Sequence, residues 1–137
     1  MSVAKSQICR LLVWAAAFGW GVSIVGTLLP WEWMEFVLQG MGKSCVTDDP
    51  MIRYHFRMAT GGWSIIGFLY LCCALNPRKY ASMLPLLAWG ALFEGVILLI
   101  HGLALGLAAF PFLGDVAFCF VTGGGILLAE GRGKTAQ

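Results

Sequence analysis

The sequence predicts an all-α integral membrane protein, an antiparallel bundle of four membrane-spanning helices with both chain ends in the cytoplasm. Hydrophobic residues make up 59% of the 137 positions and charged residues 12%, which is more apolar than a soluble domain requires. The apolar residues form four runs, and each is near the ~20 residues that cross a bilayer. Polar faces with a period of 3.6, which a soluble bundle would show, are almost missing from the third and fourth runs.

Basic residues predict the orientation of these spans, because short basic segments tend to remain in the cytoplasm. Six basic residues oppose Glu130 on the expected inner side, namely Lys5, Arg10, Arg78, Lys79, Arg132 and Lys134. On the expected outer side three basic residues face five acidic ones: Lys43, Arg53 and Arg57 against Glu32, Glu35, Asp48, Asp49 and Asp115. The basic residues form no single stripe, so we expect no nucleic-acid partner. An even number of spans, with both chain ends inside, is typical of a protein of the bacterial inner (cytoplasmic) membrane.

The four spans are expected at about 11–29, 56–75, 81–103 and 112–129, and they account for one domain over residues 1–137. The first run continues well past the small residues at 15–17, so we expect a retained signal anchor and not a cleaved signal peptide. Short connections at 76–80 and 104–111 make consecutive helices neighbours.

An extramembrane segment between the first two spans contains a predicted interfacial helix. Pro30 ends the first span, and the following residues combine aromatic rings with two carboxylates. Such a composition favours a short amphipathic helix at the outer interface. We expect Trp31, Trp33 and Phe36 to anchor it there, because aromatic rings prefer that depth. Further along, Thr47 or Asp48 is a candidate cap for a helix that begins near Pro50.

Small residues four positions apart predict close helix packing inside the bundle. The pairs are Ala17 with Gly21, Gly19 with Ser23, Ala91 with Gly95, and Gly102 with Gly106. Glycines at 61–62 and 123–125 extend the pattern less regularly.

Four ionisable residues in or near the outer half of the bundle form the candidate site: Arg57, Glu94, His101 and Asp115. Glu94 lies near the expected bilayer midplane, where a carboxylate faces the bundle interior, pairs or stays protonated. His101 is two turns further along the same helix face, and Arg57 has a side chain long enough to extend inward. Two interpretations remain open: a structural network centred on Arg57, or a pocket that binds a proton, a metal ion or a polar head group.

The sequence contains no motif for a metal or redox site. No HxxxH or ExxH spacing occurs among the candidate ligands, so we expect no metal. The five cysteines include no CxxC pair, and Cys72 and Cys73 are interpreted as packing residues. No serine or cysteine has a local base, so a catalytic residue is not predicted.

The chain resembles the DoxX-like small four-helix membrane proteins of bacteria. The resemblance rests on Leu29-Pro30, Arg57 with Gly61-Gly62, the hairpin at 76–79, Glu94, and His101-Gly102. It implies the four-helix fold. Members associated with redox enzymes suggest a quinone-linked role, which no redox cysteine pair in this sequence supports.

Three functional hypotheses follow, of which the third, an enzyme, has only the four-residue cluster in its favour. The first is a non-catalytic accessory or assembly subunit of a larger membrane complex, in contact with lipids and with other membrane subunits or further copies of itself. The second is a protein that binds or transports a lipid, a quinone or a proton through the four-residue cluster. No cofactor is predicted, although a bound lipid or quinone is compatible with the second expectation.

Overall fold

The computed structural model describes residues 3–40 and 49–134, and every regular element in these two ranges is helical. The elements are α1 (Val3–Gly21), α2 (Ile24–Leu28), α3 (Trp31–Gly40), α4 (Pro50–Leu75), the 3-10 turn η1 (Ala81–Met83), α5 (Leu84–Ala104) and α6 (Ala109–Lys134). Four helical stretches are long and apolar enough to cross a membrane: Gln7–Leu28, Pro50–Leu75, Ala81–Ala104 and Ala109–Glu130. The predicted all-α class is confirmed, and these four stretches are typical of an integral membrane protein.

The first span is interrupted near its outer end. Helix α1 ends at Gly21, and α2 begins at Ile24 after a turn in which the Ser23 N–H donates to the Trp20 carbonyl at 3.3 Å. Glycine lowers helix stability at this point. The single predicted helix over 11–29 is therefore two helices in sequence.

Helix α4 begins six residues before the predicted span. Asp49 caps it, with its carboxylate accepting a hydrogen bond from the Met51 N–H at 2.8 Å, and Pro50 occupies the first turn. A capping carboxylate followed by proline is a strong local start signal. The alternative caps, Thr47 and Asp48, lie outside the described residues.

The last two spans begin with irregular backbone. Ala81–Met83 form a 3-10 turn before α5, and Phe110 is extended at φ −105° and ψ 135° within the first turn of α6. Gly106 has a positive φ of 60° in the intervening turn, a conformation that glycine adopts without steric cost.

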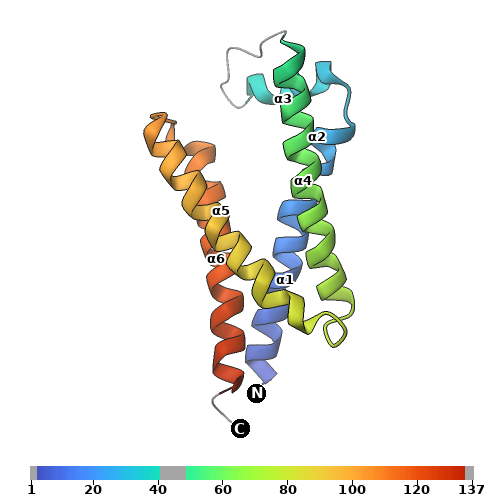
Figure 1. Ribbon diagram of the computed structural model, residues 1–137, viewed down its shortest axis with the longest axis vertical. Helices are drawn as coiled ribbons and strands as arrows, with labels where there is room; N and C mark the ends of the chain where they lie inside the picture. The colour runs from blue at the N-terminus through green and yellow to red at the C-terminus, as the bar shows by residue number, and fades with distance from the viewer. Residues whose placement is uncertain (1–2, 41–48, 135–137) are drawn as a thin grey trace.

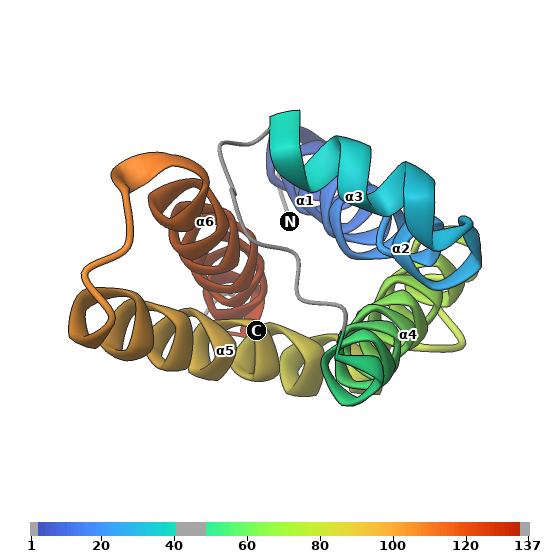
Figure 2. The ribbon, with the colours of Figure 1, turned by 90° about the horizontal axis from the view of Figure 1, so that it is seen from above.

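The long helices form two pairs, and the pairs diverge toward the end that carries α3 (Figure 1). Helix α4 packs along α1 and α2, and α6 packs along α5 and also contacts α1. Seen along the long axis, α5 and α4 lie at different edges of the molecule and approach each other near their connecting hairpin (Figure 2). The first described residues of α1, the α4–α5 hairpin and the last described residues of α6 share one end.

The core lies where the two pairs meet. Tyr70 is fully buried, and its hydroxyl donates to the Leu87 carbonyl at 2.8 Å, which connects α4 to α5. Trp20 packs edge-on against Phe118 with ring centroids 6.0 Å apart, which connects α1 to α6. The remaining buried core side chains come from all four long helices: Val13, Ala16, Ala17, Cys73, Ala74, Ala88, Cys119 and Ile126.

Glycines bring the helices close together at several positions. A methyl group added at Gly67 would collide with the backbone of Gly21, so α1 and α4 cross without intervening side chains. Gly95 and Gly102 on α5 pack against Cys119 and Phe112 of α6, which confirms the packing role of these two glycines. Gly106 lies beyond α5 and faces open space, so the predicted pairing of Gly102 with Gly106 is wrong. Gly62 faces open space instead, so the expectation of close packing there is wrong.

Candidate functional site

The structure separates the four predicted site residues between the two helix pairs. Arg57 is on α4, whereas Glu94 and His101 are on α5 and Asp115 is on α6. Arg57 donates hydrogen bonds to the carbonyl oxygens of Thr27 and Leu29, the latter at 2.8 Å. Within the described residues, no ion pair joins Arg57 to Glu94 or Asp115. Arg57 therefore binds the last carbonyls of the first span, which have no partner within their own helix.

A pair of threonines reinforces this junction between the first span and α4. The Thr60 hydroxyl donates to the Arg57 carbonyl at 3.1 Å and lies 3.0 Å from the Thr27 hydroxyl. Thr60 is only 4% exposed, and Gly26 allows it to approach because a side chain there would overlap Thr60. The polar groups at the end of the first span are thus satisfied by α4.

His101 and Asp115 lie together at the turn between α5 and α6. Both side chains are exposed, and both line a cavity of about 200 Å³ whose other walls include Leu98, Leu107 and Phe112. Gly102 lets Phe112 enter this turn, since a side chain at 102 would occupy the position of the ring. A histidine and a carboxylate at one cavity provide a hydrogen-bond donor and an acceptor for a polar group.

Glu94 is half-buried on α5, next to Gly95 at the contact with α6. It lies on the same helix as Leu98 and His101 of the small cavity but does not line that cavity itself. No hydrogen bond or ion pair within the described chain reaches its carboxylate. A carboxyl group in this position is costly in hydrocarbon unless it is protonated or paired from outside the chain.

The predicted anchoring residues all belong to α3, but they face different surroundings. Trp31 packs inward, edge-on to Phe56 at 5.9 Å, with the Arg53 guanidinium 5.0 Å from its ring centroid. Arg53 also pairs with Glu35 at 3.5 Å. Trp33 and Phe36 are 63% and 75% exposed. Helix α3 is therefore held on α4 by its inner face and presents aromatic rings on its outer face.

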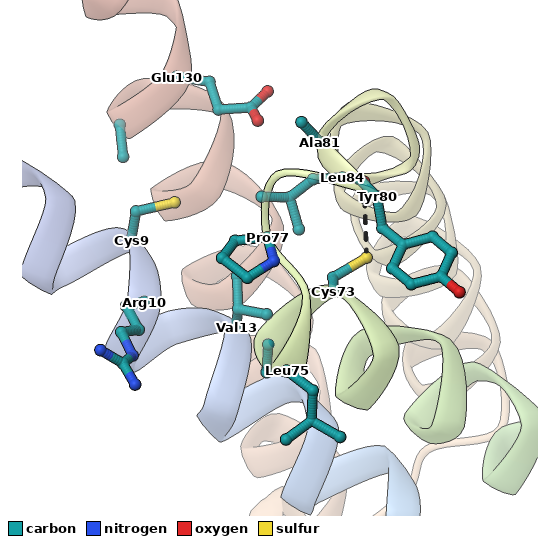
Figure 3. A pocket seen from close by; sticks show the side chains of 12 residues that line it. Cys9, Arg10, Val13, Cys73, Leu75, Pro77, Tyr80, Ala81, Leu84 and Glu130 are labelled. Carbon is teal, nitrogen blue, oxygen red and sulfur yellow. Dashed lines mark hydrogen bonds between the residues drawn. The ribbon is translucent and has the colours of Figure 1, made fainter.

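A larger cavity, of about 470 Å³, lies at the opposite end of the molecule, and the sequence interpretation did not find it. Its lining comes from α1, the end of α4, the following hairpin and the end of α6, and it includes Cys9, Arg10, Cys73, Tyr80 and Glu130 (Figure 3). The Cys73 thiol lies 3.8 Å from the Tyr80 carbonyl oxygen. These residues occur near the same expected membrane face in the sequence, which is the signal that would have grouped them.

The described residues contain no group of three or more His, Cys, Asp and Glu side chains placed to hold a metal ion. The prediction that the chain binds no metal stays a prediction. Cys45, one of the five cysteines, lies outside the described residues.

Comparison with known proteins returns no match: no family model, curated protein sequence or solved structure matches this chain. The resemblance to the DoxX-like proteins therefore stays a prediction. The class that the fold itself defines is a helical membrane protein with four candidate spans.

Proposed function

We propose that this chain is a non-catalytic integral membrane protein that serves as an accessory or assembly subunit of a larger membrane complex. The observation that carries the proposal is Glu94, a half-buried carboxyl group within a membrane-spanning helix that no described residue pairs or hydrogen-bonds. A polar side chain or backbone group of a neighbouring subunit would satisfy it.

A hydrogen-bond partner would stabilise Glu94, because this carboxyl group lies deep within its span. It lies ten residues before Ala104, the end of α5, which places it about 15 Å along the helix from that end at 1.5 Å per residue. Insertion scales assign a cost of about 2.5–3.5 kcal/mol to an acidic side chain at the centre of a span. A hydrogen bond from a second protein would offset part of that cost.

A different face of α5 from the one that carries Glu94 exposes apolar area for an additional contact. Large side chains at helical spacing are exposed along one stripe: Leu86, Trp89, Phe93, Val96, Ile100 and Leu103. Membrane lipids contact a stripe of this kind, and a partner helix packs on it equally well by van der Waals contact.

We further propose the orientation given by the basic residues. The end that carries Arg78 and Lys79 and both termini of the described chain would face the cytoplasm of a bacterial inner membrane, with the four spans as an antiparallel bundle. Helix α3 would then lie at the outer interface, and Trp33 and Phe36 would enter the lipid.

A second function is favoured by the cavity between His101 and Asp115. At about 200 Å³ it is smaller than the ~300–1,000 Å³ typical of small-molecule sites. Its occupant would be a proton or the polar head of a lipid or quinone. Arg57 would take no direct part, because its described hydrogen bonds go to the first span.

The test is native mass spectrometry of the chain extracted gently from its own membrane. We expect other polypeptides in the released assembly, retained by Glu94→Gln, which keeps a hydrogen-bonding side chain, and lost by Glu94→Leu. Glu32→Gln is the matched control, because Glu32 is an exposed carboxylate on α3.

A homo-oligomer or monomer without other polypeptides would contradict the subunit proposal. If that species holds a lipid or quinone that is lost on His101→Leu, the second function is supported instead.

A further inference from the structure

The cavity at the hairpin end has a buried base and an open side along the α4–α5 hairpin. Val13 and Ala74 belong to its base and are buried. Where the chain leaves α4 and passes through the hairpin, the lining residues Leu75, Pro77 and Ala81 are all exposed. The mouth of the cavity therefore follows the segment 75–81.

This mouth meets the apolar outer surface of α4. Leu75 lines the cavity and is also 61% exposed. It lies two turns beyond Phe68 on one helix face, and Ile65 continues that face; both side chains are exposed. All three belong to the candidate span Pro50–Leu75, so acyl chains would cover this face in a bilayer. The apolar surface is thus continuous from the span into the cavity, and a lipid chain can enter at Leu75.

We propose that this cavity binds one anionic phospholipid, with an acyl chain inside the cavity and the phosphate held at the hairpin by Arg78 and Lys79. The cavity volume of about 470 Å³ falls within the ~300–1,000 Å³ of pockets that bury small apolar ligands. The proposal does not depend on the subunit function, because it uses the opposite end of the molecule and none of the residues around Glu94.

The basic side chains of the hairpin argue for a negatively charged head group. Arg78 and Lys79 are exposed, and in the sequence they lie between the lining residues Pro77 and Tyr80. The Lys79 ammonium is 5.2 Å from the centroid of the Tyr80 ring, a cation–π contact that keeps this charge at the hairpin. Arginine and lysine bind phosphate oxygens through charged N–H donors, and basic sites between spans are typical of anionic lipid binding.

The other charged lining residues are not assigned to the head group. Glu130 already interacts with another group of the chain, and the Arg10 side chain extends away from the cavity (Figure 3). Phosphatidylethanolamine and phosphatidylcholine carry a cation beside the phosphate, which two adjacent basic side chains would repel. Phosphatidylglycerol carries the phosphate without a cation, so it matches the hairpin best among the three.

The cysteines provide a readout of occupancy. Cys9 lines the cavity and is partly exposed, and in Figure 3 its thiol extends from α1 toward Pro77. Cys72 is also partly exposed but does not line the cavity, so it reports the general effect of added lipid. Cys73 is buried and reports whether the chain stays folded. A bound acyl chain should shield Cys9 more than Cys72.

The experiment is alkylation of the purified full-length chain in detergent with N-ethylmaleimide, followed by peptide mass spectrometry, with each of the three lipids added separately. We expect phosphatidylglycerol to slow the reaction of Cys9 about tenfold relative to Cys72, as for a site about 90% occupied. Phosphatidylethanolamine and phosphatidylcholine should have little effect at the same concentration. Added salt should weaken the protection, because it screens the exposed hairpin charges.

The double variant Arg78→Gln/Lys79→Gln should require at least about tenfold more phosphatidylglycerol for the same protection, because each basic residue near a membrane surface contributes severalfold to anionic lipid binding. The matched control is Arg78→Lys/Lys79→Arg, which keeps both charges and should keep the protection. Alkylation of Cys73 would reveal a variant that is not folded, and the salt dependence of the unmodified chain then decides. Equal protection by all three lipids, no protection by any, or phosphatidylglycerol protection unchanged by salt and by loss of both charges would each overturn the proposal.

Discussion

Arg57 combines two roles that are usually separate, a charged side chain near a membrane surface and a cap for a helix end. Its guanidinium reaches the carbonyls of Thr27 and Leu29, which lie in the last turn of the first span and just beyond it. Carbonyl groups at the end of a helix accept such donors readily. The side chain therefore fixes α2 against α4 instead of extending toward the other helix pair.

We expect Arg57→Met to lower the free energy of unfolding by about 2 kcal/mol, because hydrogen bonds from a charged donor contribute about 1.5–3 kcal/mol. Unfolding in mixed detergent micelles measures the loss.

If Arg57 and Glu94 are energetically independent, the effects of Arg57→Met and Glu94→Leu should add to within about 0.5 kcal/mol in the double variant. A coupling energy above about 1 kcal/mol would show that the two side chains interact directly.

At the scale of the element, the first span is defined by its contact with α4. The α-helical hydrogen-bond pattern changes after Gly21, where the Ser23 N–H donates to the Trp20 carbonyl three residues earlier, at the point where Gly67 approaches the backbone. Two helices can approach this closely only where neither presents a side chain. The interruption of the first span after Gly21 and the glycine at position 67 of α4 therefore belong to the same helix crossing.

Gly67→Ala should destabilise the protein by about 1–3 kcal/mol, because the methyl group collides with backbone that has little freedom to move. Gly62→Ala provides the control on the same helix. Gly62 faces open space, so alanine there should leave stability unchanged or raise it by up to about 1 kcal/mol through helix propensity. Unfolding of both variants under identical conditions checks the difference, and equal effects would contradict the crossing.

At the scale of the whole molecule, the helices form two diverging pairs joined at the hairpin end. The contacts of Tyr70 with Leu87 and of Trp20 with Phe118 connect the pairs. Toward the other end, Arg57 and the His101–Asp115 cavity belong to separate pairs. The cavity at the hairpin end, in contrast, receives residues from both.

The proposed orientation predicts the outcome of topology reporters expressed in a bacterium. Fusions of green fluorescent protein after Lys79 and after Gln137 should fluoresce, because both positions are expected in the cytoplasm. A fusion of alkaline phosphatase after Gly40 should be active, since α3 is expected on the outer side. Phosphatase activity after Lys79 would reverse the orientation.

The sequence by itself determined the helical class, the presence of four apolar helices and an additional helix between the first two. These features depend on local composition and length, and they are confirmed in the described residues. The start of a helix near Pro50 is confirmed as well, although its cap is Asp49 and not Thr47 or Asp48.

Only the tertiary structure decided which groups meet. Hydropathy gives the depth of a residue in a span but not the rotation of its helix or the distance between helices. Arg57 and Glu94 share a similar predicted depth, yet Arg57 binds the first span and Glu94 lies on a helix of the other helix pair. Cys9, Arg10, Tyr80 and Glu130 share a cavity because packing brings together segments that are distant in the sequence.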